Sequence, residues 1–290
     1  MNTWEANIRK VVPYTPGEQP NQPDMIKLNT NENPYPPAPG VEKALHGIQP
    51  DTLRLYPDPT AGDLVHAIAC NYGLKDEQVF VGVGSDDVLA MSFLTFFNSD
   101  KPILFPDITY SFYDVWADLF RIPYECKALD ENFCIRKEDY FGENGGIIFP
   151  NPNAPTGVEL PLSDIEEILL HNRDVIVIVD EAYVDFGAKS ALELIEKYDN
   201  LLVVQTFSKS RSMAGARLGF ALGSEALIRD LETIRFSTNP YNLNRLTLLL
   251  GEAAVADDAY YMENCKKIAA TRERTATRLK ELGFTLAPSQ

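Results

Sequence analysis

The sequence predicts an α/β fold in which a mostly parallel sheet is sandwiched between helices. Through the middle of the 290-residue chain, short apolar runs alternate with longer amphipathic segments, and this alternation is typical of a parallel sheet with helical connections. Residues 174–179 are almost continuously apolar, as expected for a strand that helices cover on both faces. Polar residues of chemical interest follow the ends of these runs, where open α/β sheets bind their ligands.

The chain divides into three expected parts. Residues 1–40 form an N-terminal arm, which is rich in Pro, Asn and Gln after residue 12 and ends as a rigid lip over a pocket. Residues 41–238 form the large domain. From residue 239 the pattern changes to helices at 242–255 and 259–282, followed by a strand that begins at Phe284. Residues 239–290 therefore start a smaller α+β lobe.

Hydrophobic periodicity, capping residues and runs of β-branched or aromatic residues predict the helices and strands of the large domain. In residues 63–72, Leu64, Ala67, Ile68 and Tyr72 lie on one helical face, and Ser163 is a suitable N-cap for a helix that runs to residue 170. Further helices are expected at 41–48, up to residue 97 and up to residue 120. Short runs rich in β-branched and aromatic residues predict strands at 78–83, 101–105, 123–129, 146–149, 174–179 and 201–204.

The composition excludes several classes of function. A formal net charge of -16 and a pI near 4.6 disfavour non-specific binding to nucleic acid or to an anionic membrane. No apolar run has the length of a membrane span, and the N-terminus does not open a signal peptide, so we expect a cytoplasmic protein. The cysteines lack CxxC spacing and the histidines lack a metal-ligand pattern, so no metal site is expected.

The strongest single signal is a lysine that closely follows a buried strand. Lys209 lies between Ser208 and Ser210, after the run at 201–204. Burial disfavours an ammonium group and makes a lysine amine nucleophilic, and such amines form Schiff bases with carbonyl substrates and with pyridoxal phosphate. Ser208 and Arg217 are the kind of pair that binds a cofactor phosphate. The alternative for this stretch alone is a surface cluster of basic residues on a loop.

Three further segments follow predicted strands. Ser85 and Asp86 are placed to cap a helix whose free backbone N–H groups would bind a phosphate, although an ordinary capped turn is the alternative. Asp180 and Glu181 directly follow a buried strand, and they favour a functional site because burying acids without a partner is costly. Tyr110 is placed to cover a flat ring, with core packing as the alternative.

Together these motifs resemble those of fold-type I pyridoxal-phosphate aminotransferases and, among them, the histidinol-phosphate aminotransferases. The resemblance covers almost the whole chain and implies a large domain with a mostly parallel sheet plus a smaller α+β lobe. The spacing of Lys209 and Arg217 by 217 − 209 = 8 positions, framed by glycines, is its most specific feature. The other matching motifs are residues 29–35, 56–58, 82–86, 151–157 and 180–183.

The resemblance implies a role for each matching residue. Lys209 would bind pyridoxal phosphate covalently and then act as general base, and Asp180 would keep the pyridine nitrogen protonated. Tyr183 would hydrogen-bond the phenolic oxygen of the ring, and Tyr110 would stack on its face. The other cofactor-binding residues that the resemblance implies are Ser85, Asp86, Asn153, Thr206, Ser208 and Arg217.

The resemblance also implies partners and a reaction. Tyr56 would reach the cofactor of a neighbouring subunit, so a homodimer with shared active sites is expected, and Tyr35 and Asn33 in the lip would contact substrate. The expected reaction transfers the amino group of L-histidinol phosphate to 2-oxoglutarate, giving imidazole acetol phosphate and L-glutamate, as in histidine biosynthesis. The alternatives are decarboxylation of threonine phosphate, transamination of aromatic or other amino acids, and a non-catalytic cofactor-binding dimer.

Two departures from the family pattern concern the active site. Ala154 stands where the family has an asparagine before Pro-Thr-Gly, so Asn153 or Tyr183 is expected to contact the phenolic oxygen. In the family, the C-terminal lobe continues as a small sheet and ends with an arginine that binds the substrate's carboxylate or phosphate. The sequence stops at Gln290, so the C-terminal lobe is expected to be incomplete.

Overall fold

A seven-stranded sheet forms the centre of the computed structural model, which describes residues 3–20, 22 and 25–290. Residues 1–2, 21 and 23–24 of the predicted arm lie outside the described part of the chain. The strand order across the sheet is β1-β7-β6-β5-β4-β2-β3. The strands are β1 Val79–Gly82, β2 Ile103–Pro106, β3 Tyr124–Lys127, β4 Ile147–Pro150, β5 Val177–Asp180, β6 Leu201–Thr206 and β7 Gly219–Gly223.

Most neighbouring strands are parallel, as the sequence predicts. The parallel pairs are β3 with β2, β2 with β4, β4 with β5 and β5 with β6, whereas β7 is antiparallel to both β6 and β1. The register pairs Thr206 at the end of β6 with Gly219 at the start of β7. The intervening loop, which carries Lys209 and Arg217, is therefore closed at its base by this pair.

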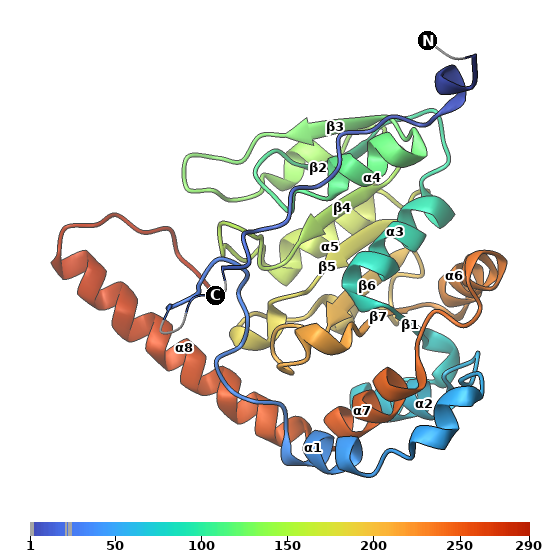
Figure 1. The fold of residues 1–290 in the computed structure, drawn as a ribbon. Helices are drawn as coiled ribbons and strands as arrows, with labels where there is room; N and C mark the ends of the chain where they lie inside the picture. The colour runs from blue at the N-terminus through green and yellow to red at the C-terminus, as the bar shows by residue number, and fades with distance from the viewer. Residues whose placement is uncertain (1–2, 21, 23–24) are drawn as a thin grey trace.

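Helices cover both faces of the sheet (Figure 1). Side chains of α3, α4 and α6 pack in one buried cluster and those of α2, α5 and α7 in the other. The helices are α1 Pro39–His46, α2 Gly62–Tyr72, α3 Gly84–Phe96, α4 Tyr113–Phe120, α5 Leu162–His171, α6 Glu225–Thr238, α7 Arg245–Ala256 and α8 Asp258–Glu281. Short 3-10 turns connect several of them, including η5 at Val184–Phe186.

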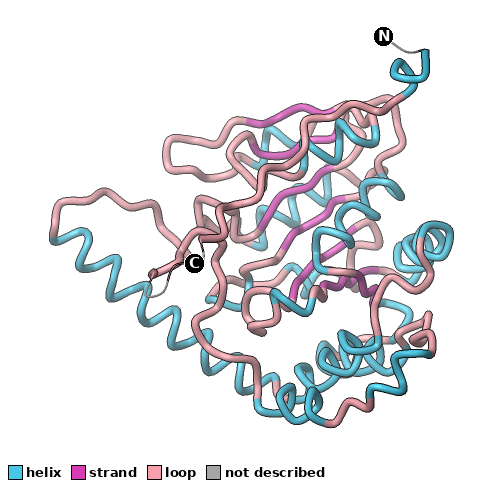
Figure 2. The backbone as a smooth tube through the Cα atoms, viewed as in Figure 1, coloured by secondary structure: helices cyan, strands magenta, loops and turns pink. Residues whose placement is uncertain are grey.

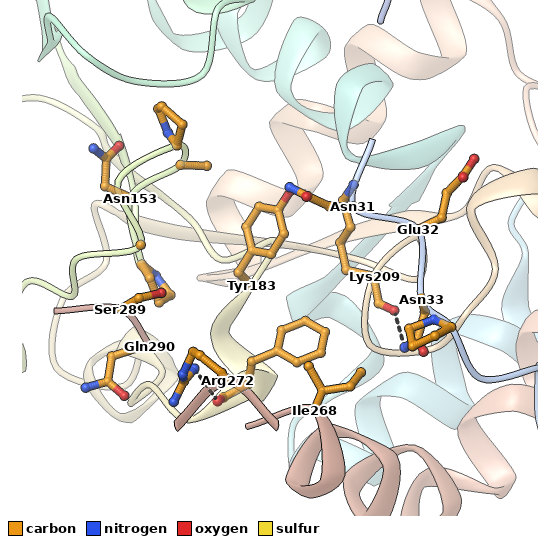
Figure 3. Close-up of a pocket in the computed structure, with 16 residues that line it drawn as sticks. Asn31, Glu32, Asn33, Asn153, Tyr183, Lys209, Ile268, Arg272, Ser289 and Gln290 are labelled. Atoms are coloured by element: carbon orange, nitrogen blue, oxygen red, sulfur yellow. Dashed lines mark hydrogen bonds between the residues drawn. The ribbon is translucent and has the colours of Figure 1, made fainter. Parts of the chain in front are cut away.

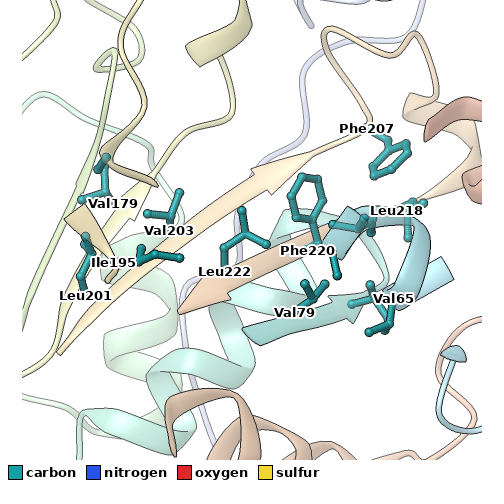
Figure 4. Packing of buried hydrophobic residues seen from close by; sticks show 14 of the residues in the cluster. Val65, Val79, Val179, Ile195, Leu201, Val203, Phe207, Leu218, Phe220 and Leu222 are labelled. Carbon is teal, nitrogen blue, oxygen red and sulfur yellow. The ribbon is translucent and has the colours of Figure 1, made fainter. Parts of the chain in front are cut away.

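The central strands are apolar throughout because both of their faces are covered. In β5, Val177 and Val179 belong to one buried cluster and Ile178 to the other, since successive side chains of a strand point to opposite faces. Figure 4 shows Val203, Phe220 and Leu222 of β6 and β7 in the first of these clusters. This packing supports the strand ends from which the candidate site residues project.

Between the 3-10 turn η1 at Thr3–Asn7 and the start of α1, the described residues of the arm form no regular helix or strand, and Figure 2 draws them as loop. Near its start, Tyr14 stacks on Phe112 with ring centroids 4.1 Å apart. At its end, the backbone N–H of Ala38 donates to the hydroxyl of Tyr261 in α8 at 3.0 Å. The arm therefore joins the α4 side of the sheet to the long helix α8.

Several local predictions were wrong or incomplete, and strand β7 was not among the expected strands. Residues 284–290 form no strand, because no neighbouring strand pairs with them in the described structure, and Phe284 is 60% exposed. Ser163 is not the N-cap of α5, which begins at Leu162 after Pro161 and has no side-chain cap. The sequence reading also missed α6, whose N-cap Ser224 accepts a hydrogen bond from the backbone N–H of Leu227.

The core around β7 provides a test of this packing. Phe220 is fully buried between Phe207 and Tyr72, and Phe220→Ala is expected to lower the free energy of unfolding by about 3–5 kcal/mol. Urea unfolding would measure this loss. Phe284→Ala, at an exposed position, is the matched control and should stay within about 0.5 kcal/mol of wild type; equal losses for the two variants would contradict the described core.

Candidate active site

Most of the predicted cofactor residues converge on one cavity of about 180 Å³, which we call the inner cavity. It lies at the carboxyl ends of β4, β5 and β6 and beside the start of α3. Its lining includes Ser85, Asp86, Tyr110, Asp180, Tyr183, Thr206, Ser208, Lys209 and Arg217. These residues come from five separate places in the sequence, so the fold alone brings them together.

Asp180 is the buried acid of this cavity. It is the last residue of β5 and 4% exposed, and its Oδ2 accepts a hydrogen bond from the Tyr113 hydroxyl at 2.9 Å. Its Oδ1 is buried and has no hydrogen-bond partner in the described structure. Burial raises the pKa of Asp180 to about 6, although the hydrogen bond from Tyr113 acts in the opposite direction. A buried acceptor without a partner indicates a site for an external donor.

Glu181, which the sequence pairs with Asp180, does not line the cavity. It is 1% exposed and accepts hydrogen bonds from the Ser190 hydroxyl, the Ala191 backbone N–H and the Gln205 side-chain amide at 2.7, 2.6 and 2.8 Å. Burial raises the pKa of Glu181 to about 7. Glu181 therefore stabilises the backbone behind the inner cavity through these hydrogen bonds and does not face the cavity itself.

Lys209 is held by the N-terminal arm (Figure 3). Its Nζ donates to the Thr30 carbonyl at 3.0 Å and lies 5.5 Å from the centre of the Tyr183 ring. The Asn33 side-chain amide donates to the Lys209 carbonyl at 2.9 Å, and the Asn31 amide donates to the Tyr183 hydroxyl at 3.0 Å. The arm thus contacts both the lysine and its neighbouring tyrosine.

The opposite end of the inner cavity is built around the start of α3. The helix begins at Gly84, with Val83 as N-cap and no side-chain cap, so the prediction that Ser85 and Asp86 cap it was wrong. Both residues lie instead in the first turn. Asp86 forms an ion pair with Arg217 at 3.0 Å and accepts a hydrogen bond from Tyr110 at 2.7 Å. Burial, followed by the charge of Asp86, raises the pKa of Tyr110, which therefore donates as a neutral hydroxyl.

Two glycines allow β7 and the start of α3 to approach each other. A Cβ atom on Gly219 would lie 2.3 Å from the Ser85 backbone nitrogen, and one on Gly84, whose φ is +80°, would lie 2.6 Å from Arg217 Nη2. Neither position has room for a larger side chain. Gly84 and Gly219 therefore permit the contact between the loop and the helix start, whereas a Cβ atom on Gly215 would meet nothing within 4 Å.

Four predicted residues lie away from the inner cavity. Asn153 is 2% exposed, and its side chain bonds Ile108, Thr109 and Thr156 at 2.9–3.1 Å, so it stabilises a turn. Asn33 and Asn153 line a second, outer cavity, whereas Tyr35 and Tyr56 line neither cavity. Tyr35 lies 5.6 Å from Lys267 Nζ, and Tyr56 is 78% exposed with its ring against Tyr241 at 4.7 Å.

The outer cavity, of about 330 Å³, opens beside Lys209 and Tyr183 and is bounded on its far side by α8 and the C-terminal tail (Figure 3). Arg272 of α8 lines it and donates to the Phe186 carbonyl at 3.2 Å. Sequence reasoning missed Arg272, Asn31 and Tyr113. Asn31 belongs to the asparagine-rich lip, which is a usable signal, whereas nothing local distinguishes Tyr113 or Arg272 from other helix residues.

Comparison with known proteins assigns the family. The family model for aminotransferase class I and II matches residues 23–290. The chain belongs to this aminotransferase family. The expectations of an aminotransferase and of its fold are therefore confirmed, and the alternative of a non-enzymatic protein is set aside.

Individual relatives and structures agree with this assignment. The aminotransferase is 52% identical to histidinol-phosphate aminotransferase 1 of Hydrogenovibrio crunogenus, over 99% of this chain and 80% of that protein. It is 51% identical to histidinol-phosphate aminotransferase of Lactococcus lactis subsp. cremoris, over 99% of this chain and 81% of that one. Histidinol-phosphate aminotransferase from Sinorhizobium meliloti, solved with pyridoxal-5'-phosphate, shares the fold with a TM-score of 0.81 at 24% identity, covering 90% of this chain and 72% of that one.

The described helices do not include one that is both long and apolar enough to cross a membrane. The longest helix, α8, carries charged residues along its length.

The buried charge of Asp180 predicts a pH-dependent stability of the cofactor-free protein. Because the folded pKa of about 6 exceeds the ordinary value of 3.8, Asp180 stabilises the fold below about pH 4, and that contribution is lost as the pH rises through 6. Asp180→Asn removes this dependence. The free energy of unfolding of Asp180→Asn should exceed that of wild type by about 3 kcal/mol at high pH. This difference should grow by about 1–1.5 kcal/mol between about pH 5 and 8.

Urea unfolding of both cofactor-free proteins across this pH range would measure the difference. Asp100→Asn, at an exposed position, is the control and should follow wild type at each pH. A stability difference for Asp180→Asn that does not change with pH would contradict a raised pKa at Asp180.

Proposed function

We propose that this aminotransferase uses pyridoxal phosphate to transfer the amino group of L-histidinol phosphate to 2-oxoglutarate, giving imidazole acetol phosphate and L-glutamate. The observation that carries the proposal is a lysine amine and a buried carboxylate oxygen without a partner on the lining of one cavity. The substrate assignment is supported by relatives of that name at about half identity over almost the whole chain.

The inner cavity fits the proposed cofactor at both of its ends. The unpaired Oδ1 of Asp180 is the acceptor that a protonated pyridine nitrogen requires. At the other end, the Ser208 hydroxyl, the Arg217 guanidinium and the first turn of α3 supply donors for a phosphate. When bound, pyridoxal phosphate supplies an aldehyde carbon that condenses with amines and a ring that withdraws electrons.

Each residue then has a defined task. Lys209 would hold the cofactor and, with its amine free, would move a proton from the substrate's α-carbon to the cofactor's C4′ carbon. Asp180 keeps a proton on the ring nitrogen, which favours loss of that α-proton. Tyr110 covers the ring, and Tyr183, oriented by Asn31, donates to its phenolic oxygen. Because Asn153 is engaged in its own turn, Tyr183 makes this contact in place of the residue that Ala154 lacks.

The substrate occupies the outer cavity, which adjoins Lys209 and Tyr183. Asn33 contributes by holding the backbone at the lysine and directly after it, through hydrogen bonds to the carbonyls of Lys209 and Ser210 at 2.9 and 3.3 Å. Tyr35 belongs to the same lip, although it does not line the outer cavity, and we expect it to contact the substrate from there. Threonine phosphate and aromatic amino acids are the competing substrates that an assay must exclude.

Assembly and location complete the proposal. The exposed Tyr56 reaches the cofactor phosphate of a second copy of the chain, so that the active sites of a homodimer are shared. The protein is cytoplasmic, and its acidic surface disfavours nucleic acid and anionic membranes as partners. Residues 1–40 form the arm, 41–238 the large domain and 239–290 the start of the small domain.

Absorbance spectra test the cofactor and the substrate together. Wild type loaded with pyridoxal phosphate should show a visible band that shifts when L-histidinol phosphate is added, whereas Lys209→Ala should lack the band and lose at least about 10²–10⁴-fold in turnover. Lys101→Ala, at an exposed ion pair remote from the site, is the control. A band that ignores L-histidinol phosphate but responds to threonine phosphate or an aromatic amino acid would overturn the substrate assignment.

Mixed dimers test the sharing of sites. Tyr56→Ala and Lys209→Ala chains, purified together as differently tagged mixed dimers, should recover about half of the wild-type activity because one site then has both residues. Each parent dimer should have little activity. Mixed dimers as inactive as the parents would show that Tyr56 does not act across the interface.

A further inference from the structure

We propose that Tyr113 is a positioning residue for Asp180, holding one carboxylate oxygen so that the other stays directed at the cofactor's ring nitrogen and remains ionised. The inference rests on the proposed function, because it assumes that Asp180 pairs with this nitrogen. It adds a residue that the sequence motifs do not include. It also gives that residue a task separate from packing.

The buried surroundings of Tyr113 direct its hydroxyl to a hydrogen bond with Asp180. Tyr113 is the first residue of α4 and fully buried. Its ring packs among Phe93, Phe105 and Trp116, with centroids 5.8–6.3 Å away. In these apolar surroundings the hydroxyl donates to Asp180 Oδ2 at 2.9 Å. An unpaired hydroxyl would be costly here, so the bond is strongly favoured.

The bond restricts the carboxylate in a useful way. Because Oδ2 is held by Tyr113, the carboxylate cannot rotate freely about its terminal torsion, and Oδ1 keeps its place without a partner in the described structure. Asp180 also lines the inner cavity. The cofactor's N–H thus meets an acceptor that is already oriented, which lowers the ordering cost of binding.

The bond also favours the ionised acid. Burial is the largest influence on Asp180 and raises its pKa, and Asp86 of α3 raises it further. The hydrogen bond from Tyr113 is the largest influence that lowers it, followed by the backbone of Ala182 and by Lys209 on the loop after β6. Without the Tyr113 hydroxyl, the pKa of Asp180 would rise above its present value of about 6.

Tyr113→Phe tests the proposal because it keeps the ring and removes only the hydroxyl. The dissociation constant of pyridoxal phosphate, measured by equilibrium dialysis, should rise about tenfold, as for loss of a hydrogen bond to a charged group. The kcat for L-histidinol phosphate should fall with little change in KM, and the acid limb of the kcat profile should move to higher pH. Titration of the cofactor-free proteins by carboxyl NMR should show the same upward movement at Asp180.

A double-mutant comparison separates positioning from packing. In an Asp180→Asn background, Tyr113→Phe should weaken cofactor binding little further, since the two residues act as one unit. Full additivity of the two losses would mean a structural role and would overturn the proposal.

Tyr140→Phe is the matched control. Tyr140 is a second buried tyrosine, 1% exposed, whose hydroxyl has no hydrogen-bond partner in the described part of the protein. Tyr140→Phe should leave the dissociation constant of pyridoxal phosphate and the pH profile of kcat unchanged. If Tyr113→Phe behaves like Tyr140→Phe in both measurements, the proposal fails.

Failure of the proposed function has a different signature. A wild-type protein that shows no saturable binding of pyridoxal phosphate would refute the cofactor itself. A wild type that binds the cofactor but ignores L-histidinol phosphate would refute only the substrate, and the affinity and NMR comparisons for Tyr113 would still decide its role.

Discussion

The buried carboxylate of Asp180 is the interaction on which the rest of the site depends. Strand β5 lies between β4 and β6, so its last side chain ends where bulk water is scarce and a charge is costly. Tyr113 satisfies one oxygen and leaves the other for a ligand. The polypeptide alone therefore leaves this charge only partly compensated. Under the proposed function, a cationic N–H donor in the inner cavity would complete the compensation and so couple cofactor binding to the stability of the sheet.

Backbone contacts, rather than flexible side chains, place the other groups around that carboxylate. The reversal between β6 and β7 is closed by the pair of Thr206 and Gly219, and Gly219 also lets the strand touch the start of α3. The arm then reaches the lysine loop through a main-chain carbonyl of Thr30 and the amide of Asn33. Behind the loop, Arg211 is 2% exposed and pairs with Asp185 and with Asp258 at the start of α8. Arg211 thereby ties this loop both to η5 and to the start of α8.

A feature could be predicted from the sequence where its signal lies in neighbouring residues, and could not where it depends on partners far away in the chain. The central strands and the convergence of Asp180, Lys209 and Arg217 were predictable, because fully covered strands are apolar throughout and ligands bind at their carboxyl ends. Tyr113 and Asn31 were not, because their importance depends on partners 67 and 152 residues away. The strand expected at Phe284 failed for a related reason: β-propensity needs a neighbouring strand, and the described structure has none at that place. Asn153 was expected to contact the cofactor, whereas its hydrogen bonds in the structure serve its own turn.

The arm has a consequence for how the protein is made. Thr30 leaves the ribosome long before Lys209, since 179 residues separate them, although the Thr30 carbonyl accepts a hydrogen bond from the Lys209 amine in the folded protein. At translation rates of about 5–20 residues per second, Lys209 is synthesised about 10–35 s after Thr30. Ile26 and Leu28 of the arm are more than three-quarters exposed even in the finished fold, so these apolar side chains stay accessible to solvent after that interval as well. The contact between Thr30 and Lys209 can therefore form only after the chain has been synthesised as far as residue 209.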